Sequence, residues 1–431
     1  MKHFSLILVL ALIVPVFKEP ARADDRPKSS LSKDEIDWLR QHAIALRGVD
    51  PKGGFDDLHG LRDMVGEARI VAVREATHGS SEAFLVKHRI TAFLAREKGF
   101  SIFALETGMA EAYRLNEYIQ TGQGDPRQLL TLLGYWDWNI QEYLDLVGWM
   151  REWNRSGNGR VEFWGFDMQT PDAALENIRS FVDSVDPQYS DQLRQHFRLF
   201  FGAGKPAWLI LKKASSAEVR SLAAASGRVL KHLQEGCDKY TQKKSAFDVD
   251  WAIQNARLLE QNLISCTKPF DTSYRDQCMA DNVAWICERA RPNAKVVISA
   301  HNAHLTRKAR GTMGAHLDKR YGRSMFVLAS TFYQGRYNAV GLWGSSDPTA
   351  HEAALAPPGS LEARVHEVGV PAMLLDLRQA RQSPAAWFTQ RLPMRDVGYK
   401  VQLIEFTPVV VTDEYDGLIF FERSSPSKLL R

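Results

Sequence analysis

Short apolar runs that end in an acidic or imidazole side chain recur along the chain. Residues 70–75 read IVAVRE, residues 101–106 read SIFALE, and residues 295–301 read KVVISAH. Runs of this length, rich in β-branched and aromatic residues, predict buried β-strands. Further strands are predicted at 161–167, 325–330, 337–342, 372–377 and 417–421.

The segments between the first strands show helical spacing instead. After His78, the apolar residues at 83, 86, 90, 93 and 94 recur at helical spacing, and Gly99 ends the predicted helix. A strand, a helix and a strand in this order predict parallel strands joined by a right-handed crossover. Another helix is predicted to start after Ser32, because Glu35 completes the spacing of a capping box.

Residues 172–291 are predicted to be almost entirely helical. Segments such as 217–235 and 249–265 keep apolar residues at helical spacing, and no good strand lies between them. The predicted fold class is therefore α/β, with a mostly parallel central sheet flanked by helices and an α-helical lobe inserted in the middle of the chain. The α/β catalytic core would comprise residues 24–171 and 292–431.

The first 23 residues have the pattern of a secretory signal peptide. Lys2 precedes an apolar run over residues 4–16, and Ala21-Arg22-Ala23 matches a cleavage site. The run is too short to span a bilayer comfortably, and no other segment of the sequence could cross one. We therefore expect an exported protein, periplasmic or secreted, with no stable membrane insertion after cleavage.

Composition narrows the class of partner. Of the 431 residues, 45% are hydrophobic and 25% are charged, as in an ordinary globular protein. The formal net charge is +4, and no long basic run occurs, so no nucleic-acid partner is expected.

The cysteines of an exported chain can form disulfides, and four cysteines allow three pairings. None of them has C-x-x-C spacing, so a cysteine zinc site is not expected. If the helices of the lobe run up and down, about 27 Å of helix separates Cys237 from Cys266, and Cys278 lies about 13 Å from Cys287 on one helix. The predicted pairing is then Cys266–Cys278 with Cys237–Cys287.

The ends of the predicted strands carry the candidate chemistry. Glu75 and His78 follow the first run, Glu106 ends the second, and the later run ends at His301 and His304. Ligands of open α/β sheets bind outside the carboxyl ends of the strands, so these side chains are expected on one face. Two carboxylates and three imidazoles there can perform acid–base chemistry near neutral pH.

The same residues carry a family resemblance. E-A-T-H-G at 75–79, A-L-E at 104–106, G-F-D at 165–167 and H-N-A-H at 301–304 occur in the order typical of the erythromycin esterase family. The chain resembles this family from about Leu39 to about Phe421, which implies hydrolysis of a carboxylic ester or lactone, such as a macrolide lactone. One departure is Arg74, where the family usually has glycine; the larger side chain would narrow the site or add a charge to it.

No nucleophile motif such as G-x-S-x-G occurs, so water is expected to attack the substrate. The resemblance implies that His78 is the general base, and Glu75 or Glu106 would orient it. His301, His304 and Lys87 would donate to the developing oxyanion. No metal or other cofactor is expected. The residues expected to contact the small-molecule substrate are Lys87, Arg74, Trp136, Asp167 and Arg275.

Two other readings of the sequence stay open. The E-x-x-H and H-x-x-H patterns, with a further glutamate, contain enough ligands for Zn²⁺, although H-E-x-x-H is absent. A metal-dependent hydrolase is therefore one alternative. The other is a non-catalytic periplasmic binding protein of the same fold, which Arg74 in place of glycine would favour.

Overall fold

The computed structural model describes residues 30–201, 204–268, 271–291, 293–344 and 347–430. The predicted signal peptide, residues 1–23, lies outside these ranges. Within them, no helix has the length and apolar character needed to cross a membrane.

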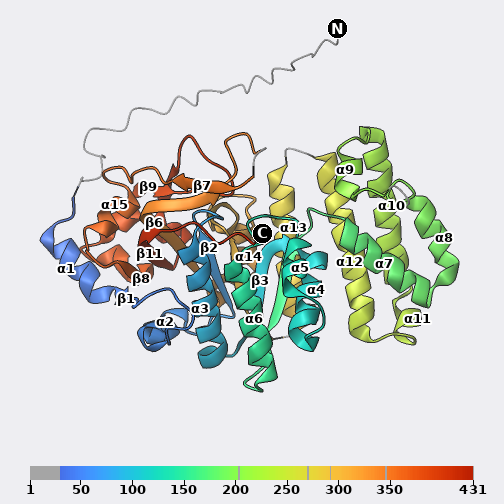
Figure 1. Ribbon diagram of the computed structural model, residues 1–431, viewed down its shortest axis with the longest axis horizontal. Coiled ribbons are helices and arrows are strands. Elements are labelled where there is room, and N and C mark those ends of the chain that lie inside the picture. Colours follow the sequence, from blue (N-terminus) through green and yellow to red (C-terminus); the bar gives the residue numbers. More distant parts are fainter. Residues whose placement is uncertain (1–29, 202–203, 269–270, 292, 345–346, 431) are drawn as a thin grey trace, which may run out of the picture.

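The structure is built on one large, mostly parallel sheet, which confirms the predicted α/β class (Figure 1). Strands β11, β6, β2, β5, β3 and β4 are neighbours in this order and pair in parallel. Strands β1, β8 and β7 join by antiparallel pairing. The bounds are β1 (Ile44–Ala45), β2 (Ile70–Glu75), β3 (Phe100–Gly108), β4 (Glu162–Asp167), β5 (Lys295–His301), β6 (Met325–Ala339), β7 (Thr349–Glu352), β8 (Ala372–Asp376) and β11 (Gly417–Ser424).

The runs at 325–330 and 337–342, predicted as two strands, form the single long strand β6 with the residues between them. A separate antiparallel pair, β9 (Arg391–Arg395) and β10 (Phe406–Val410), was not predicted. Its sequence mixes arginine and proline with apolar residues and lacks the continuous apolar run of the central strands.

Helices cover both faces of the sheet because its buried strands are apolar on both sides. In β2, Ile70 and Ala72 belong to one core cluster, whereas Val71 and Val73 belong to the other. The first cluster includes residues of α13 (Thr272–Trp285), α14 (Met313–Tyr321) and α15 (Leu361–His366), and the second includes residues of α2 (His59–Val65), α3 (Ser81–Lys98) and α6 (Gln141–Arg155). This alternation sends Arg74 and Glu75 to opposite faces.

The predicted helical block is present at one end of the molecule, beside the α/β core (Figure 1). Its own hydrophobic cluster runs from Leu175 to Leu263. It comprises α7 (Asp172–Val185), α8 (Pro187–His196), α9 (Ala207–Leu211), α10 (Ser216–Glu235), α11 (Cys237–Thr241) and α12 (Ala246–Thr267). The next helix, α13, instead packs Cys278, Met279 and Val283 into the core under the sheet.

Four further α-helices lie in the described residues outside the lobe. They are α1 (Lys33–His42), α4 (Met109–Thr121), α5 (Pro126–Thr131) and α16 (Val411–Glu414). The predicted capping box at the start of α1 is confirmed, with Ser32 and Glu35 bonded reciprocally.

The predicted disulfides are wrong: all four cysteines are free thiols. The prediction treated α13 as a third helix of the lobe. Because α13 packs under the sheet, Cys278 and Cys287 are buried in the α/β core, while Cys237 lies in the lobe and Cys266 is exposed at the end of α12.

Candidate active site

The turn after β2 presents His78 beside Glu75. The backbone N–H of His78 donates to the carbonyl of Gly398 at 3.1 Å, and Ser80 caps the following helix α3. Gly79 is required here because a Cβ atom would collide with the backbone of Asn338. Nδ1 of His78 then lies 3.1 Å from Oε1 of Glu75, an ion-pair distance without the alignment of a full hydrogen bond.

Lys87 holds Glu75 in place through the carboxylate oxygen that does not face His78. It lies on α3, is almost completely buried, and forms an ion pair with the second carboxylate oxygen of Glu75. Its Nζ also donates to Oγ of Ser299 at 2.8 Å. Burial lowers the pKa of Lys87 well below its usual value, although the charge of Glu106 opposes this. Lys87 therefore contacts the carboxylate that holds His78, and it lies outside the cavity that His78 lines.

Glu106 organises a second group of charges. Its Oε1 accepts from Nη2 of Arg275 at 3.0 Å and lies 3.2 Å from Nε2 of His304. Its Oε2 accepts from the backbone N–H of His301 at 3.0 Å, which ties the end of β3 to that of β5. Asp167, at the end of β4, accepts from Arg275 at 2.6 and 3.2 Å.

The pKa shifts in this group follow from the pairing. Burial alone would raise the pKa of Glu106, but His304 and Arg275 lower it well below its usual range, so Glu106 stays ionised. Burial would lower the pKa of His304, but Glu106 and a 2.7 Å contact from its Nδ1 to Asp276 raise that pKa to about 10. His304 is therefore an imidazolium near neutral pH, with both ring nitrogens occupied by carboxylates.

His301 faces His78 across the site, with ring centroids 5.2 Å apart. Its Nε2 lies 3.1 Å from Asp396, and its Nδ1 accepts from the backbone N–H of Ala303 at 3.2 Å. Burial lowers the pKa of His301, and Asp396 acts in the opposite direction. An accepting Nδ1 and a lowered pKa both indicate a neutral ring.

A cavity of about 580 Å³ opens over these side chains. Aromatic residues from the loop before α6 and from the segment after β9 form much of its wall. The predicted site residues that line it are His78, Glu106, Trp136, Arg275, His301 and His304. Glu75 lies behind His78, and Asp167 lies behind Arg275. The strand ends thus meet on one face, as the sequence predicted.

Arg74 lies on the other side of β2. It is fully buried, its Nη2 donates to the carbonyl of Asn302, and its guanidinium lies 4.2 Å from the centre of the Tyr415 ring. It lines a different cavity from His78. Contact with the substrate was predicted for Arg74 and Lys87, and neither side chain reaches the cavity over His78.

Three carboxylates of the site were missed. Asp276 and Asp396 hold His304 and His301. Asp276 directly follows Arg275 in the sequence, whereas nothing in the sequence marks Asp396. Asp137 lines the cavity, and its Oδ1 has no hydrogen-bond partner among the described residues. Burial raises the pKa of Asp137 to about 6, with His78 acting in the opposite direction. The position of Asp137 between Trp136 and Trp138, two aromatic residues of the cavity wall, is the sequence feature that could have indicated its role.

A metal centre needs several ligating side chains around one point. In the parts of the chain that the structure describes, no group of three or more histidine, cysteine, aspartate or glutamate side chains is arranged to hold a metal ion. The guanidinium of Arg275 occupies the position between Glu106 and Asp167.

The fold and the site together define an α/β protein with an acid–base cluster at the carboxyl edge of its sheet. The sequence model of the erythromycin esterase family matches residues 95–424, and the chain belongs to this family. Family membership supports a hydrolase that acts on ester bonds.

Known proteins agree with this placement. Erythromycin esterase type II of Escherichia coli is 25% identical over 331 residues, which cover 70% of this chain and 78% of that protein. The putative hydrolase YbfO of Bacillus subtilis (strain 168) is 22% identical over 455 residues, with 99% and 98% covered. A mutant of erythromycin esterase EreC in its open conformation has the same fold, with a TM-score of 0.72, 17% identity, and 89% and 98% covered.

Proposed function

We propose that the protein hydrolyses a carboxylic ester or lactone by direct attack of water, with His78 as the general base. The observation that carries this proposal is the placement of His78, held by Glu75 on one side and open to the cavity on the other. A carboxylate at Nδ1 favours the tautomer with its proton there, which leaves Nε2 free to accept a proton from water. Glu75 also stabilises the imidazolium that forms.

The cationic side of the cavity suits the substrate carbonyl. Arg275 lines the cavity, and ion pairs with Glu106 and Asp167 fix its position. In this proposal Arg275 contacts the oxyanion that forms on attack. His301 is a positioning residue, because Asp396 and the backbone N–H of Ala303 occupy both of its ring nitrogens. His304 is a positioning residue, because Glu106 and Asp276 occupy both of its ring nitrogens. Lys87 is a positioning residue for Glu75.

Asp137 completes the proton balance. A buried carboxyl with a pKa of about 6 is partly protonated near neutral pH, so it can donate a proton to the leaving alkoxide. Water gives its hydroxyl to the acyl carbon and one proton to His78, and Asp137 gives its proton to the leaving alkoxide, so the products are a carboxylic acid and an alcohol. Transfer of a proton from the His78 imidazolium to the Asp137 carboxylate then restores both groups.

The aromatic wall favours a substrate with an apolar body, and a lactone ring meets this description. Because the Escherichia coli relative is named an erythromycin esterase, a macrolide lactone is a candidate substrate. Cleavage would then confer antibiotic resistance. The predicted signal peptide supports an activity in the periplasm or outside the cell as part of this proposal.

The test compares His78→Ala with His59→Ala, an exposed histidine on α2, on simple esters, simple lactones and macrolides. We expect turnover of at least one class, a loss of about 10²–10⁴-fold in kcat for His78→Ala, and no change for His59→Ala. Equal turnover by both variants would refute the role of His78. Activity lost on chelation and restored by Zn²⁺ would favour the metal-dependent alternative, and no turnover by the wild type would favour the binding protein.

A further inference from the structure

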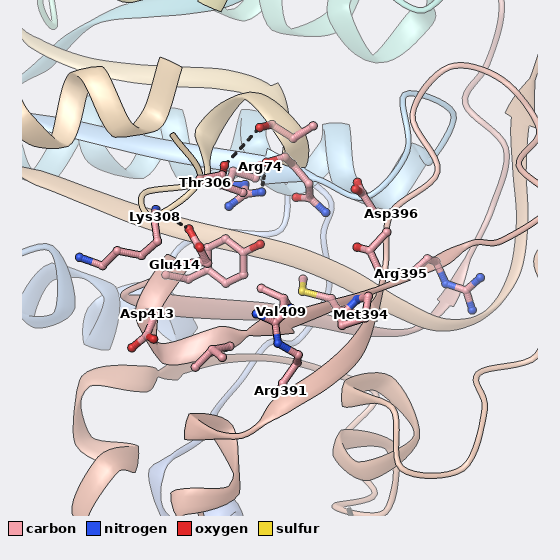
Figure 2. Close-up of a pocket in the computed structure, with 17 residues that line it drawn as sticks. Arg74, Thr306, Lys308, Arg391, Met394, Arg395, Asp396, Val409, Asp413 and Glu414 are labelled. Carbon is pink, nitrogen blue, oxygen red and sulfur yellow. Dashed lines mark hydrogen bonds between the residues drawn. The ribbon is translucent and has the colours of Figure 1, made fainter. Parts of the chain in front are cut away.

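A second cavity, of about 390 Å³, lies on the other side of the sheet's carboxyl edge. Its walls come from β2, from the turn after β5, from the β9–β10 pair and from α16. Arg74 and Arg391 are on opposite walls of the cavity (Figure 2). Asp396, which contacts His301 of the active site, also borders it. The catalytic proposal does not use this cavity.

The guanidinium of Arg74 is the unusual feature of this cavity. Its side chain is fully buried, and only Nη2 has an aligned acceptor, the carbonyl of Asn302. The hydroxyl of Tyr415 is near, but Nε and Nη1 have no hydrogen-bond partner among the described residues. A buried cation that lacks acceptors is costly unless something else supplies them.

The carboxylates at the cavity wall are committed to other groups. Asp396 lies 3.1 Å from His301, and Asp413 forms an ion pair with Arg381 at 2.6 Å. Glu414 accepts from the backbone N–H groups of residues 307 and 308 at 2.6 and 3.0 Å.

Two other cationic side chains border the cavity without a carboxylate partner among the described residues. Lys308 and Arg391 are exposed at its rim and are not paired with a carboxylate in the described residues. Arg395 also borders the cavity, but it is turned away and bonded to Glu405 and to backbone carbonyls (Figure 2). The cavity therefore offers one buried cation and two at the rim.

We propose that this cavity binds a small organic monocarboxylate, with its carboxylate toward Arg74 and its apolar body against the β9–β10 pair. Met394, Val409 and Val410 supply the apolar contacts. The volume lies within the range of small-ligand sites. A dianion such as phosphate is disfavoured because Asp396, Asp413 and Glu414 add three negative charges to the same wall.

The test is calorimetric titration of the full chain with benzoate, with benzamide as the neutral analogue and inorganic phosphate as the dianion. Only benzoate should bind. Val409→Trp, which fills the cavity without touching the active site, and Arg74→Gln should each weaken binding at least about tenfold, the loss expected for a charge-assisted hydrogen bond or a blocked site. Arg391→Gln removes a positive charge at the rim of the cavity. Because Arg391 is exposed, this variant tests the role of positive charge without risk to the fold. Ile404→Trp is the matched control, because Ile404 is exposed and lines neither cavity.

Arg275→Gln separates the two cavities. If benzoate binding is lost in Arg275→Gln and kept in Val409→Trp and Arg391→Gln, benzoate occupies the cavity over His78 and the proposal fails. It fails equally if benzoate does not bind the wild type, or if benzamide binds as well as benzoate. Each readout is direct binding, so the result is independent of whether the protein hydrolyses esters.

Discussion

Replacing Asp137 with asparagine should make the protein more stable and less active. The carboxyl is only 7% exposed, lines the cavity over His78, and has a pKa raised from 3.8 to about 6 by burial. Asparagine keeps the shape of the side chain and carries no charge. The substitution therefore removes the cost of burying an ionised group and, with it, the proposed proton donor.

The magnitude follows from the raised pKa. Because the folded state holds the proton more tightly than the unfolded state, the wild type loses stability as the pH rises from about 3.8 to about 6 and stays level above that window. Each tenfold change in acidity is worth about 1.4 kcal/mol, so the ionised carboxyl costs about 3 kcal/mol above pH 6. Asp137→Asn should equal the wild type at pH 3.8 or below and exceed it by about 3 kcal/mol at pH 7.

Urea denaturation across this pH range measures the free energy of unfolding, and Asp37→Asn on α1, an exposed aspartate, serves as control. Activity is measured on an alkyl ester and on a nitrophenyl ester of the same acid. Loss of a general acid should lower kcat about 10²–10⁴-fold for the alkyl ester and far less for the nitrophenyl ester, whose leaving group needs no proton. A pH-independent stability difference would refute the buried-charge argument, and equal losses on both esters would refute the acid role.

Three further outcomes test other parts of the structure. Lys87→Met should lower kcat about 10–100-fold with little change in KM, because Lys87 supports Glu75 and lies outside the cavity; a rise in KM alone would contradict this. The pKa of His304 is raised to about 10 from 6.5, so its stabilising effect is complete below pH 6.5 and is lost as the pH rises through 10. Asp276→Asn should therefore flatten the fall in unfolding free energy over that window, and an unchanged slope would contradict the contact. Thiol titration without reductant should find four thiols in denaturant, with Cys266 reacting and Cys278 and Cys287 protected in the folded protein; fewer than four would show a disulfide.

The sequence predicted those parts of the site that depend on local pattern. The runs that form β2, β3, β4 and β5 are continuous and apolar, so their ends, and the acids and imidazoles on them, could be placed at one edge. Glu75 and His78 are three residues apart, which makes their contact a local property of the turn.

The missed features depend on packing between distant segments. Asp396, directly after β9, contacts His301, and the β9–β10 pair that positions it has no clear sequence signal. The free cysteines depend on where α13 packs, and helical periodicity does not specify which layer a helix joins. For Arg74 the information was present, because alternation along β2 already sends its side chain to the face opposite Glu75.

Asp396 connects the two cavities, and this gives the proposed carboxylate site a consequence for catalysis. Its pKa is lowered below 3.8 because His301 and Arg74 outweigh the effect of burial. A carboxylate bound at Arg74 would offset that positive charge, leave the negative charge of Asp396 less balanced and strengthen its contact with His301, which lines the cavity over His78. Coupling between two binding sites is reciprocal. If benzoate changes the affinity for substrate by some factor, substrate in the cavity over His78 must change the affinity for benzoate by the same factor. Benzoate should therefore change kcat in the wild type and have no effect on the activity of Val409→Trp; inhibition that is purely competitive and persists in that variant would show that the cavities are not coupled through Asp396.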